Sequence, residues 1–275
     1  MRAARILALL SAGVILVVAE GRAQPSSEWP RLTEAAWREM TPERIASLLE
    51  THEVNARSAW GGITPLMAAG GFSEDPEVIG VLLDAGATIE NRSDADFTAL
   101  MTAARFNANA DVIETLLDAG ADVRAEDAGG RTPLMAAAWS NPNPEVIRIM
   151  LDAGASIDAR DVWGGTVLIT AAKWNCNAEV LEVLLDAGAA LEARDSEGRT
   201  ALMFSVMDAE GLHVNSKAVR VLLEAGADVH VRDTRGRSAL DYIRNNDELR
   251  GTDVYWELYE RTLTIPRYGT LDVRR

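Results

Sequence analysis

Hydrophobic and polar residues alternate along this chain in a pattern that repeats five times. A threonine followed by a run rich in Leu, Met and Ala recurs every 34 residues, at Thr64, Thr98, Thr132, Thr166 and Thr200. A second segment in each copy places apolar residues at i, i+1, i+4 and i+5, as in Val146, Ile147, Met150 and Leu151. This spacing is typical of one buried face of a helix. Each repeat therefore predicts two short helices.

The polar residues between these runs supply start and stop signals. The repeated threonine is suited to cap the first helix, and Pro65 and Pro133 follow at a position that needs no amide donor. Aspartate or asparagine begins the second helix, at Asp75, Asn109, Asn143, Asn177 and Asn215. Glycines at positions 86, 120, 154, 188 and 226 favour the left-handed conformation that ends it.

An extended stretch with a turn joins each glycine to the next threonine. Residues 155–165 are one example, in which Ile157 is expected to pack into the stack while the remainder projects as a β-hairpin finger. No repeat of this size can bury its apolar face alone, so stability has to come from stacking. The predicted fold class is all-α, a solenoid of helix pairs with short β-hairpin fingers.

The segment Thr132–Asp161 resembles an ankyrin repeat, with its Thr-Pro-Leu-Met start and its Leu-Asp-Ala-Gly end. The resemblance covers about residues 31–248, and we predict an ankyrin-repeat domain at 31–261 with five full repeats and a capping repeat at each end. The histidine that usually follows Thr-Pro-Leu in this family is replaced by Met67, Met101, Met135, Ile169 and Met203. The resemblance implies that the concave surface formed by fingers and first helices binds a protein partner.

The N-terminus reads as an export signal. Arg2 and Arg5 precede an apolar run from Ile6 to Val18, which is shorter than the roughly 20 residues that span a bilayer. Small residues favour cleavage after Ala23, with Ala19 as the alternative. We expect a signal peptide at 1–23, a linker at 24–30 and a tail at 262–275. The mature protein is then exported, to the periplasm or beyond the cell, with no stable membrane anchor.

The charge narrows the class of partner. The net charge of −15 becomes −17 once residues 1–23 are removed. Such a surface repels nucleic-acid phosphates and anionic lipids and favours a basic or mixed-charge protein. Cys176 is the single cysteine, so no intrachain disulfide forms, while an intermolecular one stays open.

No catalytic, cofactor or metal site is expected. His52, His213 and His230 have no metal-ligand spacing, and the carboxylates recur with the repeat, as caps and turns do. Asp94 and Asp96 lack the other ligands of a calcium loop. An enzyme is therefore a remote alternative.

Six residues are the candidates for partner binding. Arg105, Trp139 and Lys173 occupy a variable position at the end of the first helix, and Trp60, Phe97 and Trp163 are assigned to finger tips. Large exposed aromatics are typical binding anchors. Aromatics at 72, 106 and 174 are interpreted as structural residues that fill the turns between helices. The longer loop 208–214 of the fifth repeat is either a recognition element or the result of neutral drift, and the sequence favours neither. The leading hypothesis is a non-catalytic interaction module, and the alternative is an immunity or inhibitor protein that neutralises a toxic enzyme.

Overall fold

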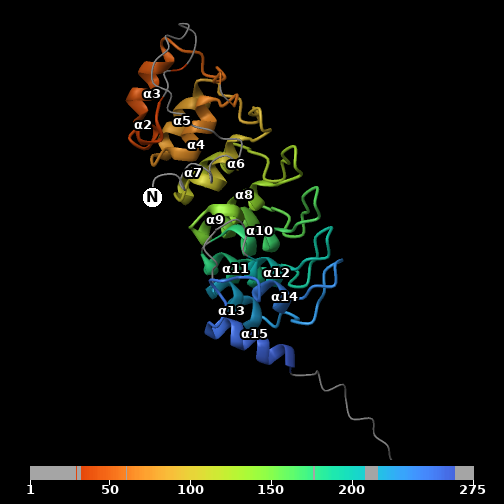
Figure 1. Ribbon diagram of the computed structural model, residues 1–275. Helices are drawn as coiled ribbons and strands as arrows, with labels where there is room; N and C mark the ends of the chain where they lie inside the picture. Colours follow the sequence, from red (N-terminus) through yellow and green to blue (C-terminus); the bar gives the residue numbers. More distant parts are fainter. Residues whose placement is uncertain (1–28, 30–31, 60, 176, 208–215, 264–275) are drawn as a thin grey trace, which may run out of the picture.

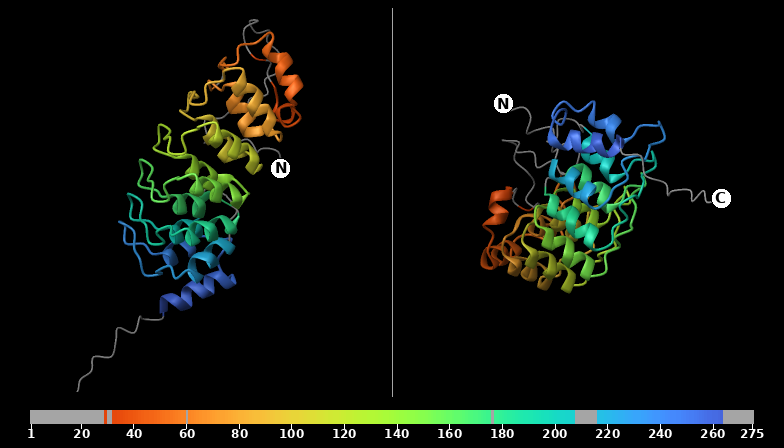
Figure 2. Two further views of the ribbon diagram at one scale, coloured as in Figure 1. Left: turned by 180° about the vertical axis from the view of Figure 1, so that it is seen from behind. Right: turned by 90° about the horizontal axis from the view of Figure 1, so that it is seen from below.

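The helices form two layers that run along an elongated stack. The computed structural model describes residues 29, 32–59, 61–175, 177–207 and 216–263. Figure 1 shows helix pairs added one after another, with the fingers projecting from one edge, and Figure 2 shows the same edge from behind. The predicted signal peptide, Trp60, Cys176, Asn215 and the loop 208–214 lie outside the described residues.

Each repeat contributes one helix to each layer. The first layer contains α2 (Glu34–Arg38), α4 (Pro65–Phe72), α6 (Ala99–Phe106), α8 (Pro133–Ser140), α10 (Val167–Trp174), α12 (Ala201–Val206) and α14 (Ala239–Ile243). The second layer contains α3 (Pro42–Leu49), α5 (Pro76–Asp84), α7 (Ala110–Asp118), α9 (Pro144–Asp152), α11 (Ala178–Asp186), α13 (Ser216–Glu224) and α15 (Asp253–Leu263). Within each layer, every helix packs against the one from the next repeat. The all-α solenoid expected from the sequence is confirmed.

The helix starts lie where the capping residues predict them. Thr132 Oγ1 accepts a hydrogen bond from the Met135 amide, and Thr64, Thr98 and Thr166 cap their helices in the same way. Asn143 Oδ1 accepts from the Glu145 amide at 3.0 Å, so it is the N-cap of α9. Gly154, just after α9, has φ +90°, the left-handed value that ends the helix. Local sequence therefore determines where these helices begin and end.

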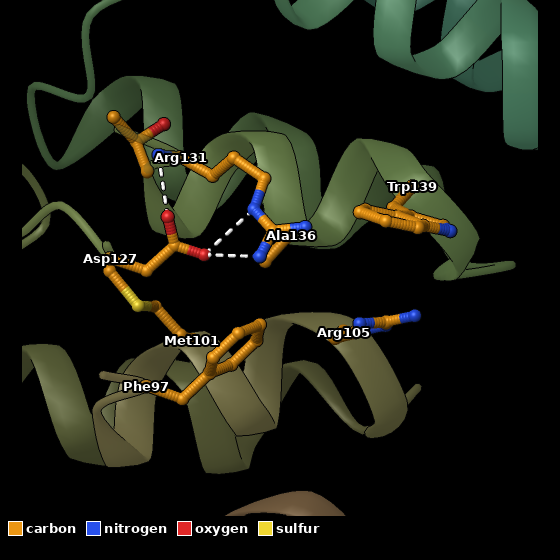
Figure 3. A pocket seen from close by; sticks show the side chains of 8 residues that line it. Phe97, Met101, Arg105, Asp127, Arg131, Ala136 and Trp139 are labelled. Carbon is orange, nitrogen blue, oxygen red and sulfur yellow. Dashed lines mark hydrogen bonds and ion pairs between the residues drawn. The ribbon is translucent and has the colours of Figure 1, made fainter. Parts of the chain in front are cut away.

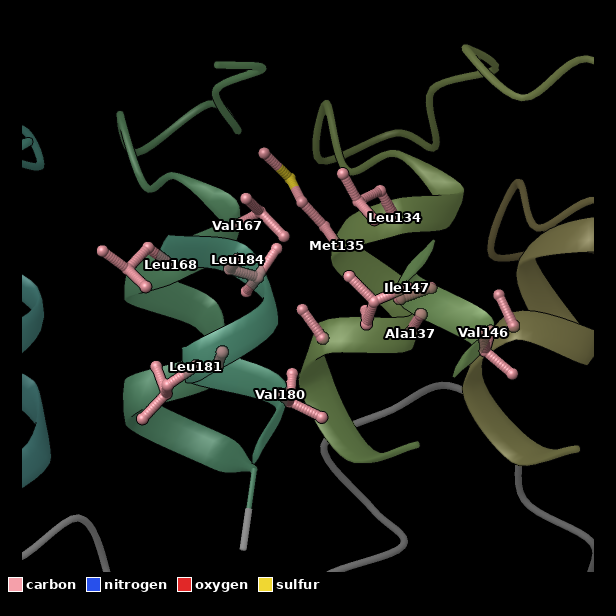
Figure 4. Close-up of a cluster of buried hydrophobic side chains, with 14 of the residues drawn as sticks. Leu134, Met135, Ala137, Val146, Ile147, Val167, Leu168, Val180, Leu181 and Leu184 are labelled. Carbon is pink, nitrogen blue, oxygen red and sulfur yellow. The ribbon is translucent and has the colours of Figure 1, made fainter. Parts of the chain in front are cut away.

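A continuous apolar core lies between the two layers. Leu134, Ile147, Leu168 and Leu184 are almost fully buried, and Figure 4 shows them interdigitating between adjacent repeats. The methionines at 67, 101, 135 and 203 are each only 1% exposed. Apolar packing thus occupies the position where the family usually places a histidine.

The fingers are hairpin turns, but none of those described contains a β-strand. Within one finger, the Asp127 amide donates to the carbonyl of Arg131 at 3.0 Å. Between neighbouring fingers, the Val162 amide donates to the carbonyl of Gly129 at 2.9 Å. Such isolated bonds do not form a ladder, so the expected β-hairpins are turns linked side by side.

Asparagines at the ends of the first helices connect the repeats. Asn141 is fully buried, and its Nδ2 donates to the carbonyls of Ala104 and Asn107 in the preceding repeat at 2.7 and 2.8 Å. Its Oδ1 accepts from the Asn143 amide at 2.9 Å. Asn107 and Asn175 make the same three bonds in their own repeats. We call Asn107, Asn141 and Asn175 the asparagine ladder.

A second set of asparagines reinforces this connection at the surface. Asn143 Nδ2 donates to the carbonyl of Ala108 in the preceding repeat at 2.8 Å, in addition to its capping bond. Asn109 and Asn177 do the same. The residues that begin the second helices therefore also bind one repeat to the next.

The ends of the domain differ slightly from the expected boundaries. Trp29 falls in the predicted linker, yet its indole stacks on Trp37 at 6.2 Å and donates to the carbonyl of Glu53 at 2.6 Å. At the other end, α15 continues to Leu263 rather than stopping at residue 261. The contacts of Trp29 at one end, and the helical backbone of α15 at the other, continue slightly beyond the expected bounds.

We predict that Asn141→Ala destabilises the protein by about 3 kcal/mol, because two buried carbonyls lose their donor and one amide its acceptor. Asn143→Ala is the matched control in the same turn, and because its capping bond and its bond to the Ala108 carbonyl are both at the surface, their loss should cost about 1 kcal/mol. Urea unfolding followed by circular dichroism measures both. Equal losses would show that the buried ladder contributes no more than an ordinary cap.

Candidate functional site

Trp163 is the most exposed aromatic side chain on the fingers that the structure describes, at 58% of its full accessible area. Its own finger is rigid, because Asp161 Oδ1 accepts from the amides of Trp163 and Gly165 at 2.9 and 2.7 Å. The Trp163 carbonyl accepts from the Ser196 amide of the next finger at 2.8 Å. The backbone is thus held on both sides while the indole, next to an equally exposed Val162, faces solvent.

Phe97 is not a finger-tip anchor, and that expectation is wrong. The side chain is 4% exposed and packs against Met101 and Ala125. It directly precedes the capping residue Thr98, at the base of its finger, and the guanidinium of Arg131 covers its ring at 5.7 Å. The position beside the capping threonine was the sequence signal that places it at the base.

Arg105 is also buried, against the expectation that the variable position at the end of the first helix is exposed. Only 6% of the residue is accessible, because its guanidinium lies 4.4 Å from the ring centre of Trp139 and 5.1 Å from that of Phe106. Burial, and to a lesser extent the neighbouring Arg131, lower the pKa of Arg105 to about 10, although Asp127 acts in the opposite direction. Arg105 is covered by Trp139, which belongs to the next repeat. The sequence pattern within a single repeat cannot show this contact.

Trp139 and Lys173 are half-buried members of a row of rings and cations on the first helices. Trp139 stacks on Trp174 with ring centres 5.3 Å apart. Lys173 Nζ lies 4.5 Å from the ring of Trp174 and 5.3 Å from that of Phe204. Trp139 therefore supports its neighbours as well as facing the surface. We call Arg105, Trp139, Trp174, Lys173 and Phe204 the cation–aromatic row.

Three fingers carry a buried aspartate paired with an arginine four residues later, which the sequence reading did not identify. Asp127 Oδ1 accepts from the amides of Gly129 and Arg131, and its Oδ2 accepts from Arg131 Nε at 2.7 Å (Figure 3). Asp195 with Arg199, and Asp233 with Arg237, repeat this geometry. The recurring Asp-x-x-Gly-Arg spacing was the available signal. These pairs fix three guanidinium groups against the rings at 97, 139, 204 and 242.

The last of these pairs is the most strongly bonded. Tyr242 donates its hydroxyl to Asp233 Oδ2 at 2.6 Å, beside the bond from Arg237 Nε at 3.0 Å. Burial alone would raise the pKa of Asp233, but the bonds from Tyr242 and from Arg237 outweigh it and hold the pKa at about 2. Burial and the same hydrogen bond raise the pKa of Tyr242 to about 12.

A small pocket lies on this surface between α6 and α8 (Figure 3). Part of its lining is apolar, and Arg105, Asp127 and Arg131 supply charged groups. The full lining comprises Phe97, Met101, Arg105, Asp127, Arg131, Thr132, Ala136 and Trp139. Thus four residues of this lining belong to the finger bases and four to the first helices, with Arg105 and Trp139 among them.

The described residues contain no group of three or more His, Cys, Asp or Glu arranged to hold a metal ion. In the same part of the chain, no helix has the length and hydropathy needed to cross a membrane.

Comparison with protein families gives one match, to a model of ankyrin repeats in three copies, at residues 32–127, 66–161 and 134–233. The overlapping matches cover residues 32–233, well over half of the chain. None of the curated proteins compared with the chain matches it.

We predict that Asp233→Asn destabilises the protein by about 2 kcal/mol at neutral pH, since it removes charge-assisted bonds. The folded pKa lies below the unfolded value near 3.9, so the carboxylate stabilises fully above about pH 4 and its contribution is lost as pH falls towards 2. Urea unfolding of both proteins from pH 7 to pH 2 measures this. A difference that stays constant over that range would contradict the assignment.

Proposed function

Because the chain belongs to the ankyrin-repeat family, we propose that it is a non-catalytic module that binds a protein partner. The docking surface consists of the fingers and the cation–aromatic row of the first helices. In repeat proteins of this kind, a rigid stack presents side chains that differ from copy to copy. Here those side chains are mainly indole rings and cations, which are enriched at the energetic centres of protein interfaces.

The exposure of Trp163 is the observation that carries this proposal. A tryptophan contributes a large contact area at a small cost in side-chain entropy, because it has only two rotatable bonds. The rigid backbone on both sides of Trp163 lowers the ordering cost further. Although the edge of the indole lies beside Gly129 of the preceding finger, more than half of the residue faces solvent, and a partner best explains this exposed part.

The charges on the finger side favour a partner of mixed charge over a uniformly basic one. The net charge of the chain is −15, which attracts basic groups at long range. Yet the finger bases are not acidic, because Arg131, Arg199 and Arg237 balance their aspartates there, and two buried nitrogens of Arg105 have no acceptor in the described residues. A partner that presents acidic groups at the centre and basic groups around them complements both features.

We also propose that the protein is exported from the cytoplasm, because residues 1–23 resemble a cleavable export signal. An exported acidic binder suits the alternative in which the partner is a toxic enzyme that this chain neutralises. The two are separated by measuring the activity of the captured partner with and without bound chain, because only an inhibitor suppresses it.

Export has a direct test. Mature protein isolated from the source organism should begin at Gln24, or at Glu20 if the alternative site is used, and should be found outside the cytoplasm. N-terminal sequencing of the protein from fractionated cells makes this measurement. Cytoplasmic protein that retains residues 1–23 would contradict the prediction.

The docking surface is tested with a photo-crosslinking amino acid placed at position 163. We expect a specific crosslink from this position and none from position 148, an exposed site on the opposite layer in α9. With the captured partner purified, Trp163→Ala should weaken binding by about 2 kcal/mol or more. Its unfolding free energy should change by less than about 0.5 kcal/mol, because the side chain is exposed.

Trp139→Ala is not an equivalent variant, because Trp139 also packs against Trp174 and Arg105. Equal crosslinking from positions 163 and 148, or unchanged affinity in Trp163→Ala, would move the docking surface away from the fingers.

A further inference from the structure

Arg105 is a buried cation without a hydrogen-bond acceptor. Its Nε and Nη1 atoms are inaccessible to solvent and have no partner within the part of the chain that the structure describes. The residue is 6% exposed, so water does not replace the missing partners. A buried charge without hydrogen bonds is costly, and natural proteins retain such groups mainly where another interaction compensates.

The neighbouring carboxylate cannot supply the missing bonds. Asp127 uses Oδ1 for the amides of Gly129 and Arg131, and Oδ2 for two nitrogens of Arg131, each at 2.7 Å. Arg131 is thereby neutralised within the chain. Of the two guanidinium groups that line the pocket, Arg105 is the one with buried nitrogens that have no acceptor in the described residues.

The surroundings of Arg105 hold its guanidinium group in one orientation. Figure 3 shows it at the pocket, beneath the ring of Trp139 and beyond that of Phe97. The guanidinium carbon of Arg105 lies 4.4 Å from the ring centre of Trp139, and this cation–π contact holds the group without using its N–H groups. A guanidinium fixed in this way is ordered in advance for an acceptor that enters the pocket.

We infer that the Arg105 pocket, defined by Phe97, Met101, Arg105, Asp127, Arg131, Thr132, Ala136 and Trp139, binds a carboxylate group of the protein partner. This inference rests on the proposed function and specifies the chemistry at the centre of the same surface. A carboxylate is planar, carries one negative charge and accepts charge-assisted hydrogen bonds from guanidinium nitrogens. One unneutralised guanidinium matches that single charge.

A phosphate group fits this site less well. It carries a charge between −1.5 and −2 near pH 7 and is usually held by several cations. Here Arg131 is already paired with Asp127, and the whole chain has a net charge of −15. The carboxylate belongs either to a partner's C-terminus or to an aspartate or glutamate side chain, and the two sources are separated by the choice of probe.

The test is a titration of ¹⁵N-labelled full-length chain, followed by NMR at the Arg105 Nε–H and Trp139 indole signals. N-acetylglycine presents a terminal carboxylate, and N-acetylglutamic acid α-amide presents a side-chain carboxylate. N-acetylglutamine α-amide is the neutral control, and inorganic phosphate is the competing anion. We expect at least one carboxylate probe to shift both signals saturably and to bind about tenfold or more tightly than the neutral amide.

Arg105→Met and Arg131→Met form a matched pair of variants from the same pocket. Arg105→Met keeps the apolar stem and removes the unpartnered charge, so we expect it to lose carboxylate binding while its melting temperature stays the same or rises. Arg131→Met leaves Asp127 buried without its cation and should lower the melting temperature. A lower melting temperature in Arg105→Met would show that the contacts of Arg105 with Trp139 and Phe106 also stabilise the stack, and the wild-type titration would then decide the question.

Three results would overturn the inference: equal binding of the neutral amide, binding of phosphate without either carboxylate, or unchanged carboxylate binding in Arg105→Met. The wild-type titration with the neutral amide decides the question even if a variant does not fold. The titration needs no partner, so its failure is distinct from failure of the proposed function. A crosslink at position 163 together with no carboxylate binding at Arg105 would leave the docking surface in place and remove this pocket from it.

Discussion

The buried turn between the two helices of each repeat is the constraint on which the rest of the structure depends. The first helix ends inside the stack, where the carbonyls of its last turn have no water to bond. Asn141 supplies donors to the end of the preceding repeat's first helix, because its side-chain amide donates to the carbonyls of Ala104 and Asn107. The backbone carbonyl of Asn141 accepts in turn from the side chain of Asn175. An asparagine is suited to this position because its amide offers donors and an acceptor on a short side chain.

The asparagine ladder also fixes the spacing between repeats. Each bond joins equivalent turns of adjacent units, so the layers cannot slide past one another without leaving buried polar groups unpaired. In the fifth repeat α12 ends earlier, at the C-cap Met207, and the position that the repeat spacing makes equivalent is Ala209. Asn246 resumes a similar bond by donating to the carbonyl of Val206 at 3.1 Å. The longer loop thus occurs where the asparagine is missing.

A fixed stack allows the finger side to hold groups that do not contribute to stability. Asp127 and Arg131 form an ion pair with each other. Beside them, the Nε and Nη1 atoms of Arg105 have no hydrogen-bond acceptor in the described residues, and more than half of Trp163 is exposed to solvent. Exposed rings and unpaired charges of this kind are usual costs of a binding surface. Polar groups are therefore paired where repeats join, whereas the finger side also holds Arg105 and Trp163, which we propose contact the partner.

Some of this arrangement could be predicted from the sequence and some could not. Thr132, Asn143 and Gly154 act within a few residues of themselves, so their roles as caps were readable from local spacing. The carbonyls bonded by Asn141 lie in another repeat, and local spacing does not show them.

The errors at the site have the same origin. Arg105, at a variable helix end, and Phe97, assigned to a finger tip, were expected to bind a partner, yet they are covered by Trp139 and Arg131 of the next repeat. Exposure in a stack depends on the neighbouring layer. Trp163 was placed correctly on the surface because it lies at the tip of a finger, where no further layer covers it.

The most direct measurement is hydrogen exchange of the asparagine side-chain amides, followed by NMR under native conditions. The account predicts that the Nδ2 protons of Asn141 exchange as slowly as the backbone amides of α8, because both become accessible only when repeats separate. The side chain of Asn245, which is exposed and bonded within its own helix region, is the internal reference for fast exchange. Exchange of Asn141 at the rate of Asn245 would contradict the claim that buried asparagines hold the stack together.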